Sequence, residues 1–196
     1  PCEMKACPPG FYDVDGDSCT GECGCEYECE FISDEDLLDE DYTDENCDGS
    51  DGVVSQCVYV SASAGSPDGS GAPWDPLSDI SIALQKAAAD GLPAVCLGDG
   101  VHELGYAVQL VSGVEVRGRY DEDHPLAPFR RSPDAESTVQ AEGSVFVGEN
   151  IDAPTRIYQV SIEALTPELP SESTYGVRLA SGAANLHIDE CRSEER

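Results

Sequence analysis

The sequence predicts a mainly β protein, in which a coiling parallel solenoid with one amphipathic α-helix follows a small disulfide-rich loop module. From Val53 onward the chain consists of apolar segments about five to eight residues long and rich in Val, Ile and Tyr, which is typical of strands. Asn-Gly hairpin turns are missing between these segments, and loops of variable length take their place, which disfavours an antiparallel meander. Before Val53 the chain is rich in cysteine and poor in large apolar residues.

This change in composition divides the chain into an acidic, disulfide-rich module, residues 1–52, and a β-rich part, residues 53–196. Residues 1–57 contain eight of the ten cysteines and eighteen of the forty acidic residues, but a single basic residue, Lys5. Such a segment cannot fold on hydrophobic burial alone, so cross-links should hold it together. Because disulfides persist in oxidising compartments, the even number of cysteines predicts an extracytoplasmic protein.

The chain shows no leader-like start and no apolar run of the roughly 18 residues that a membrane helix needs. We therefore expect a mature protein or a fragment, such as the N-terminal part of a longer solenoid. The net charge of −30 disfavours binding to nucleic acid or to anionic lipid, because both depend on Lys and Arg. Cations, cell-surface polysaccharide and other surface proteins remain as partners.

Residues 77–91 are expected to form the helix, because their apolar side chains recur at helical spacing. Ser78 is the expected N-cap, and Gly91 is the expected C-terminal stop. The residues assigned to the buried face are Leu77, Ile80, Leu84, Ala87 and Ala88.

Alternation within the strand segments predicts which of their faces is buried. In residues 114–120 one face carries Val114, Val116 and Gly118, and the opposite face carries Glu115, Arg117 and Arg119. The same alternation assigns four further residues to the interior: Val160, Ile162, Leu186 and Ile188.

Two stretches resemble known families. WDPLSDISIALQKAAADGLPAVCLGDGVHELGYAVQLVSGVEVRGRYD resembles the opening of right-handed parallel β-helix proteins of the pectate-lyase-like superfamily. In those proteins an amphipathic helix leads into a V-L-x-x-G-x-Y strand and then an L-x-S-G-V-x-V-x-G strand, to which AVCLGDGVHE and VQLVSGVEVRG correspond here. This resemblance implies a short right-handed parallel β-helix whose open apolar end is capped by the helix. In that arrangement the strands that contain Cys57 and Cys96 lie side by side, which predicts a disulfide between them.

Ahead of this stretch, GFYDVDGDSCTGECGCEYECEF and TDENCDGSDG resemble the Cys- and Asp-rich modules of secreted bacterial surface proteins, which are grouped with proposed metal-binding repeats. The two resemblances together cover residues 7–120. They imply a protein that is secreted by a bacterium or held at its surface.

Carboxylates at alternate positions predict calcium sites in the acidic module, because loops that wrap Ca²⁺ turn successive oxygen ligands inward. One segment reproduces the first half of the D-x-[DN]-x-[DN]-G loop, with Asp44, Asn46, Asp48 and, as a further carboxylate, Asp51. The same spacing occurs in Asp13, Asp15 and Asp17. Neither segment has the Glu of loop position twelve, so these are not EF-hands, and the expected role of the calcium is structural.

Two other interpretations of these residues remain open. Asp, Gly and Ser also form turns on acidic surfaces without any metal. Zinc is the rival ion, with the CGC segment (Cys23 and Cys25) and the flanking Cys19 and Cys29 as thiolate ligands, but in an oxidising compartment thiols pair with each other first.

No catalytic residues and no organic cofactor are expected. Glu115, Arg117 and Arg119 form one outward row, which Arg178 could extend, but a solvated strand face accounts for such residues. The three histidines, His102, His124 and His187, show no metal spacing and are expected at the surface. The expected function is that of an extracellular structural or adhesive surface protein with a calcium-stabilised module. The alternatives are a carbohydrate-binding or polysaccharide-cleaving β-helix, and a subunit of an extracellular filament or coat.

Overall fold

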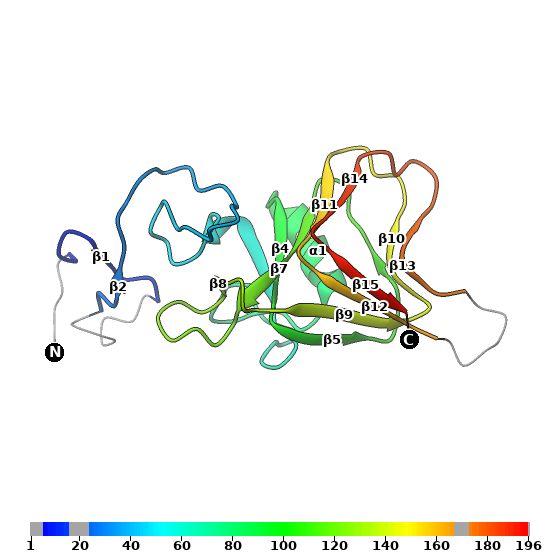
Figure 1. The fold of residues 1–196 in the computed structure, drawn as a ribbon, viewed down its shortest axis with the longest axis horizontal. Coiled ribbons are helices and arrows are strands. Elements are labelled where there is room, and N and C mark those ends of the chain that lie inside the picture. The colour runs from blue at the N-terminus through cyan, green and yellow to red at the C-terminus, as the bar shows by residue number, and fades with distance from the viewer. Residues whose placement is uncertain (1–5, 16–23, 167–172, 196) are drawn as a thin grey trace.

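The computed structural model describes residues 6–15, 24–166 and 173–195, with the N-terminal segment at one end of the long axis and the sheets at the other (Figure 1). In the N-terminal part, β1 (Phe11–Tyr12) pairs antiparallel with β2 (Tyr27–Glu28), and a short 3-10 helix (Val54–Gln56) precedes the sheets. The described part of the chain has one α-helix, α1 (Ile80–Asp90). No helix in these ranges has the length and apolar character that a bilayer crossing requires.

Three parallel sheets form the β-rich part. The first contains, in spatial order, β14 (Leu186–Asp189), β11 (Thr155–Tyr158), β7 (Glu115–Asp121), β4 (Ala94–Gly98) and β3 (Cys57–Val60). The second contains β15 (Arg192–Glu195), β12 (Ser161–Leu165), β9 (Ser137–Glu142) and β5 (Gly100–Leu104). The third contains β13 (Tyr175–Leu179), β10 (Ser144–Gly148) and β6 (Val108–Gln109). A short strand, β8 (Arg130–Arg131), pairs antiparallel with β7.

The chain visits these sheets in rotation, since β4, β5 and β6 are followed by β7, β9 and β10 and then by β11, β12 and β13. Each strand pairs in parallel with the strand one circuit earlier, as in Val95↔Val116 and Val116↔Ile157. The prediction of a mainly β fold with parallel strands and one α-helix is therefore confirmed.

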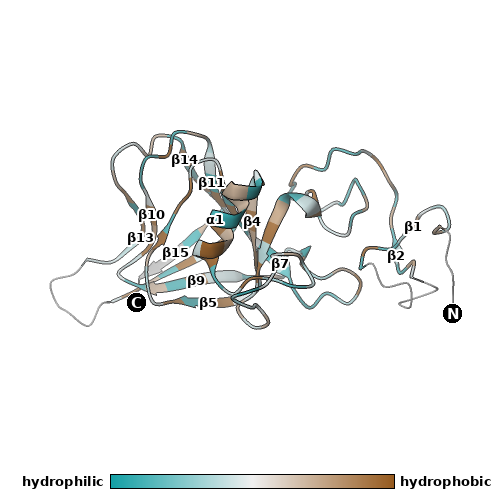
Figure 2. Cartoon of the chain, turned by 180° about the vertical axis from the view of Figure 1, so that it is seen from behind, coloured by the Kyte–Doolittle hydropathy of each residue, from teal (hydrophilic) through white to brown (hydrophobic). Residues whose placement is uncertain are grey.

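The apolar core lies between the three sheets. Fully buried side chains come from each sheet, with Ile157 in the first, Val139 in the second and Phe146 in the third. The predicted alternation holds in β7, where Val116 and Gly118 are buried between partly exposed neighbours. Figure 2 shows the apolar stretches on α1 and on nearby strands.

Helix α1 packs against β3 and β4 with Ile80, Ala83, Leu84 and Ala87 buried. Three details of the helix prediction were wrong. The helix begins at Ile80, so Leu77, which was assigned to its buried face, precedes the helix and pairs with Val60 instead. The N-cap is Asp79 rather than Ser78, because the Asp79 carboxylate accepts a hydrogen bond from the backbone N–H of Ile82 at 3.0 Å. Ala88 is exposed, and Ala83 takes its place on the buried face. The stop at Gly91 is confirmed, with a left-handed φ of 70°.

The last circuit has an open apolar end in the described residues. Ile188 pairs in register with the buried Ile157, so its assignment to the inner row is consistent with the alternation. Its side chain is nevertheless 47 % exposed, because no described strand pairs with the outer edge of β14. The prediction that Ile188 is buried was therefore wrong.

Successive circuits approach each other closely where the first sheet turns into the second. Gln159 follows β11 and Glu190 follows β14, and both have left-handed backbones with φ of 54° and 51°. A Cβ atom on Gly118 would lie 2.2 Å from the backbone oxygen of Gln159. Only a glycine therefore fits at position 118.

Gly118→Ala should lower the free energy of unfolding by about 1–3 kcal/mol, because the new methyl group must displace a neighbouring backbone. Gly105→Ala is the matched control, since nothing lies within 4 Å of its Cβ position, and it should change stability by less than about 0.5 kcal/mol. Urea denaturation of both variants measures the difference. Equal stability of the two variants would contradict the close approach.

Candidate metal centre

Disulfides fix the chain on both sides of the stretch from Asp34 to Asp51, which we call the acidic segment. They join Cys7 to Cys25, Cys29 to Cys47 and Cys57 to Cys96. The last of these links β3 to β4 and is the pair that the β-helix resemblance implied. Cys2, Cys19 and Cys23 lie outside the described residues, and Cys25 and Cys29, two of the four thiolate candidates for zinc, are held in disulfides.

One group of carboxylates is buried beside the β-rich part. Oxygens of Asp36, Asp44 and Asp48, which we call the central acidic cluster, all lie within 4.8 Å of one another. Asp36 is 5 % exposed and Asp44 is 6 % exposed, whereas Asp48 is half-buried. Such a concentration of negative charge away from water needs a counter-charge or protons.

Backbone amides hold two members of the cluster in place. Asp44 accepts hydrogen bonds from the N–H groups of Asp48 at 3.2 Å and Gly49 at 2.9 Å. Asp48 accepts from the N–H of Val54 at 2.8 Å. This local pattern follows from the alternating Asp and Asn residues, whose side chains bond to amides a few residues ahead.

Of the other two residues predicted as ligands in this segment, Asn46 contacts a member of the central acidic cluster, whereas Asp51 pairs with a base elsewhere. The side chain of Asn46 closes the turn, since it accepts from the N–H of Asp48 at 2.9 Å and donates to the Asp48 carboxylate at 3.2 Å. Asp51 forms a fully buried ion pair with Arg131 of β8.

Asp36 is the member of the cluster that the sequence analysis missed. Both of its carboxylate oxygens are buried without a donor at good hydrogen-bond geometry, as is Oδ1 of Asp48, although the Gly52 N–H is near enough to act against the rise in the pKa of Asp36. Asp36 lies eight residues before Asp44, outside the segment that matches the D-x-[DN]-x-[DN]-G motif. No local pattern distinguishes it from its neighbours.

The electrostatics of the cluster favour protons or a cation. Burial, followed by the nearby Glu45 carboxyl, raises the pKa of Asp36 to about 8. One oxygen of Glu45 is also buried without a donor. Burial raises the pKa of Asp48 to about 6, and the charge of Asp44 adds to this rise. Two carboxyl groups side by side must share a proton or a cation.

A second acidic group lies next to the β1–β2 pair. Oxygens of Asp13, Asp15 and Glu26 lie within 4.8 Å of one another, so the structure brings two predicted ligands together with one that was missed. Glu26 accepts from the N–H of Val14 at 2.9 Å, and its other oxygen is buried without a donor. The remaining predicted residue, Asp17, lies outside the described residues.

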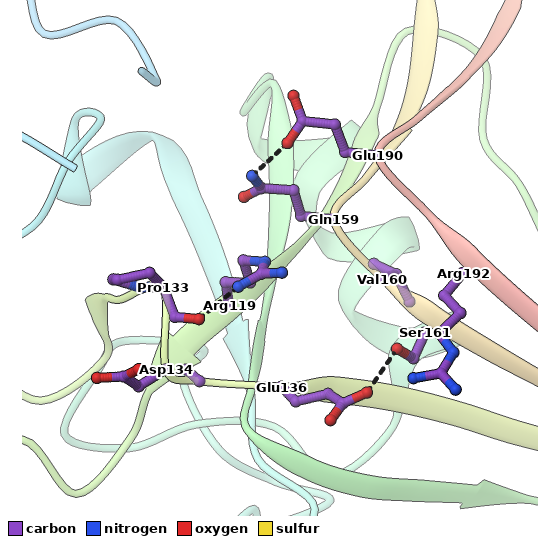
Figure 3. A pocket seen from close by; sticks show the side chains of 10 residues that line it. Arg119, Pro133, Asp134, Glu136, Gln159, Val160, Ser161, Glu190 and Arg192 are labelled. Carbon is purple, nitrogen blue, oxygen red and sulfur yellow. Dashed lines mark hydrogen bonds between the residues drawn. The ribbon is translucent and has the colours of Figure 1, made fainter. Parts of the chain in front are cut away.

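A polar groove of about 280 Å³ lies at the turn from the first to the second sheet (Figure 3). Its lining carries both signs of charge, with Glu136 and Glu190 opposite in sign to Arg119 and Arg192. Glu136 accepts from the Ser161 hydroxyl at 2.9 Å. Glu190 accepts from the side-chain amide of Gln159 at 2.6 Å.

Two residues weighed for catalysis are engaged with each other on β7. Glu115 and Arg117 form an ion pair at 2.8 Å, and both side chains are only partly exposed, so this face is less solvated than expected. The expectation that His102 lies at the surface was wrong, because it is buried and its Nε2 lies 2.9 Å from the backbone oxygen of Gly98. Burial lowers the pKa of His102 and favours the neutral ring.

Without calcium, the free energy of unfolding should fall as pH rises from about 4 to about 8. Asp36 and Asp48 bind protons more tightly in the folded chain, because their pKa values of about 8 and about 6 lie above the ordinary value of 3.8. Their contribution to the free energy of unfolding is therefore complete below pH 3.8, and it is lost as the pH rises through about 6 for Asp48 and about 8 for Asp36. Each group adds a slope of at most about 1.4 kcal/mol per pH unit.

Urea denaturation in a chelating buffer tests this dependence. Asp36→Asn should flatten the slope between about pH 6 and 8, whereas Asp34→Asn, at an exposed position of the same segment, should leave it unchanged. Identical slopes in the wild type and Asp36→Asn would show that Asp36 carries no excess proton.

Comparisons with protein-family models, with curated proteins and with solved structures find no match for this chain. Inference about its function therefore starts from the geometry of the acidic clusters and of the groove.

Proposed function

We propose that the central acidic cluster binds one calcium ion, which stabilises the acidic module of an extracellular structural or adhesive surface protein. The observation that carries this proposal is the burial of the Asp36 carboxylate beside those of Asp44 and Asp48, with no donor at good hydrogen-bond geometry to either Asp36 oxygen. Calcium is bound by six to eight oxygens at about 2.3–2.6 Å, so three converging carboxylates supply a substantial part of its shell.

The chemistry of the donors favours calcium over other metals. Both acidic clusters in the described ranges consist of carboxylates alone, whereas zinc sites are built mainly from Cys and His. Magnesium demands nearly ideal octahedral geometry and keeps several waters, which suits a buried, irregular set of oxygens poorly. Asp13, Asp15 and Glu26 form a more exposed site of the same kind, and we assign it weaker binding.

The remaining parts of the structure support an extracellular setting for this site. The three disulfides found among the described residues are typical of oxidising compartments. Rotation of the chain through three parallel sheets supports a short parallel β-helix, and the near-universal hand of parallel crossovers supports a right-handed one. Together with the pectate-lyase-like sequence pattern, these features favour a secreted or surface-held bacterial protein in which the β-helix is a rigid support.

Calcium should bind to the wild type with a Kd of about 10⁻⁴ to 10⁻³ M, as is typical of extracellular modules, and should stabilise the fold by about 1–3 kcal/mol at about 10 mM. At pH 7 binding should release about one proton, because the Asp36 carboxyl with a pKa of about 8 must lose its proton to the ion. Calorimetric titration in two buffers of different ionisation enthalpy measures both quantities.

The matched pair of variants separates the site from the general acidity of the chain. Asp36→Asn should weaken binding and abolish the proton release, whereas Asp34→Asn should retain both properties of the wild type. No binding heat and no thermal shift in the wild type at about 10 mM calcium would rule out the calcium site.

A second candidate function, carbohydrate binding, is favoured by the groove in Figure 3. Its carboxylates, guanidinium groups and amide offer donors and acceptors of the kind that bind sugar hydroxyls. Titration with oligosaccharides from bacterial surfaces tests it. Binding that Glu136→Ala weakens would support this function, and the absence of binding to any of them would contradict it.

A further inference from the structure

A single arginine of the β-rich part anchors the loops that carry the central acidic cluster. Arg131 lies on β8, and its side chain is fully buried. It contacts the acidic segment and the first sheet at once, over chain separations of 80 and 28 residues to Asp51 and Gln159.

The first loop that Arg131 contacts connects Asp36 to Asp44. Nη1 of Arg131 donates to the backbone oxygen of Asp39 at 3.0 Å, and the guanidinium carbon of Arg131 lies 4.5 Å from the centre of the Tyr42 ring. Tyr42 has a left-handed backbone, with φ of 56°, where the chain turns back toward Asp44. Arg131 thus holds the loop between the two proposed ligands at two points, Asp39 and Tyr42.

The second loop is the one that follows Asp48. The Asp51 carboxylate pairs with Nη1 of Arg131 and also accepts from the N–H of Asp39, at 3.3 Å. The Ser50 hydroxyl accepts from the N–H of Arg131 at 2.9 Å. The chain on the far side of Asp48 is therefore fastened to β8 as well.

On its other side the guanidinium is fixed by the first sheet. Nη2 donates to the side-chain oxygen of Gln159, and the Tyr158 ring centre lies 5.2 Å from the guanidinium carbon. These contacts orient Arg131 before any metal binds, because both residues belong to the rigid β-rich part.

From this geometry we infer that Arg131 is the positioning residue of the calcium site, which holds the loops on both sides of the cluster so that Asp36, Asp44 and Asp48 converge. The inference rests on the proposed calcium function. It adds that the affinity of the acidic module for calcium depends on a side chain outside the module. Arg131 also neutralises Asp51, whose negative charge would otherwise act on Asp36 unopposed.

Calcium titration of the full chain tests this role through the Kd. Arg131→Met should raise the Kd by about 10- to 100-fold, the usual effect of losing a group that orients metal ligands. Arg131→Lys should give an intermediate Kd, because an ammonium can pair with Asp51 but cannot also reach Asp39 and Gln159 in the fork geometry of arginine.

Arg156→Met is the matched control. Arg156 stacks on the same Tyr158 ring at 3.8 Å and pairs with Asp189 at 2.7 Å, and both of these partners belong to the first sheet. This variant should keep the wild-type Kd even where it lowers thermal stability. A purely structural role of Arg131 would likewise lower thermal stability and leave the Kd unchanged.

The outcomes separate this inference from the proposed function. If the wild type binds calcium and folded Arg131→Lys and Arg131→Met bind it equally well, the positioning role is wrong and the calcium site stands. If Arg131→Met does not fold, Arg131→Lys together with Asp51→Asn decides, and wild-type Kd values in both would overturn the role. If the wild type binds no calcium, the proposed function and this inference fail together.

Discussion

Repulsion among carboxylates is the constraint on which the acidic module of this structure depends. Ten acids lie between Asp34 and Asp51 with no base among them, yet part of this run is buried against the β-rich part. Burial of several like charges is unfavourable unless each meets an opposite charge, a proton or a metal. Arg131 supplies the opposite charge for Asp51. For Asp36, Asp44 and Asp48 we propose a calcium ion in that role.

The different structural roles of the β-rich part and the acidic module follow from this constraint. The β-rich part buries apolar side chains from three sheets and one helix, and therefore provides a stable support. The acidic segment has almost no apolar core of its own, so disulfides, aromatic contacts to Arg130 and Arg131, and the Ser50 bonds to β8 hold it in place. Arg130 stacks on Tyr27, and Arg131 stacks on Tyr42, so adjacent residues of one short strand contact two separate stretches of the module.

Sequence periodicity predicted the β-rich part well, because alternation and helical spacing are local properties that report burial directly. The inward row of β7 and the stop of the helix at Gly91 were confirmed. The N-cap was misassigned because Ser78 and Asp79 are both capping residues, and the approach of the chain to the helix decides between them. Burial of Ile188 was wrong because periodicity shows which face a residue takes and not whether another strand covers it.

The candidate site was predictable only where its geometry is local. Alternating residues brought Asp44 and Asp48 together, as the motif implies. Asp36 enters from a separate stretch of loop, and the partner of Asp51 lies 80 residues away on β8, so no short pattern encodes either contact. Whether an aspartate of this stretch is a ligand of the proposed calcium ion or fastens the loop thus depends on long-range pairing of charges.

The most direct measurement is a crystal structure of the full chain grown in about 10 mM calcium chloride, with anomalous scattering used to locate the ion. The account predicts one strong peak within about 2.3–2.6 Å of oxygens from Asp36, Asp44 and Asp48. Well-ordered carboxylates around an empty centre, or an ion bound elsewhere while these side chains point apart, would contradict it.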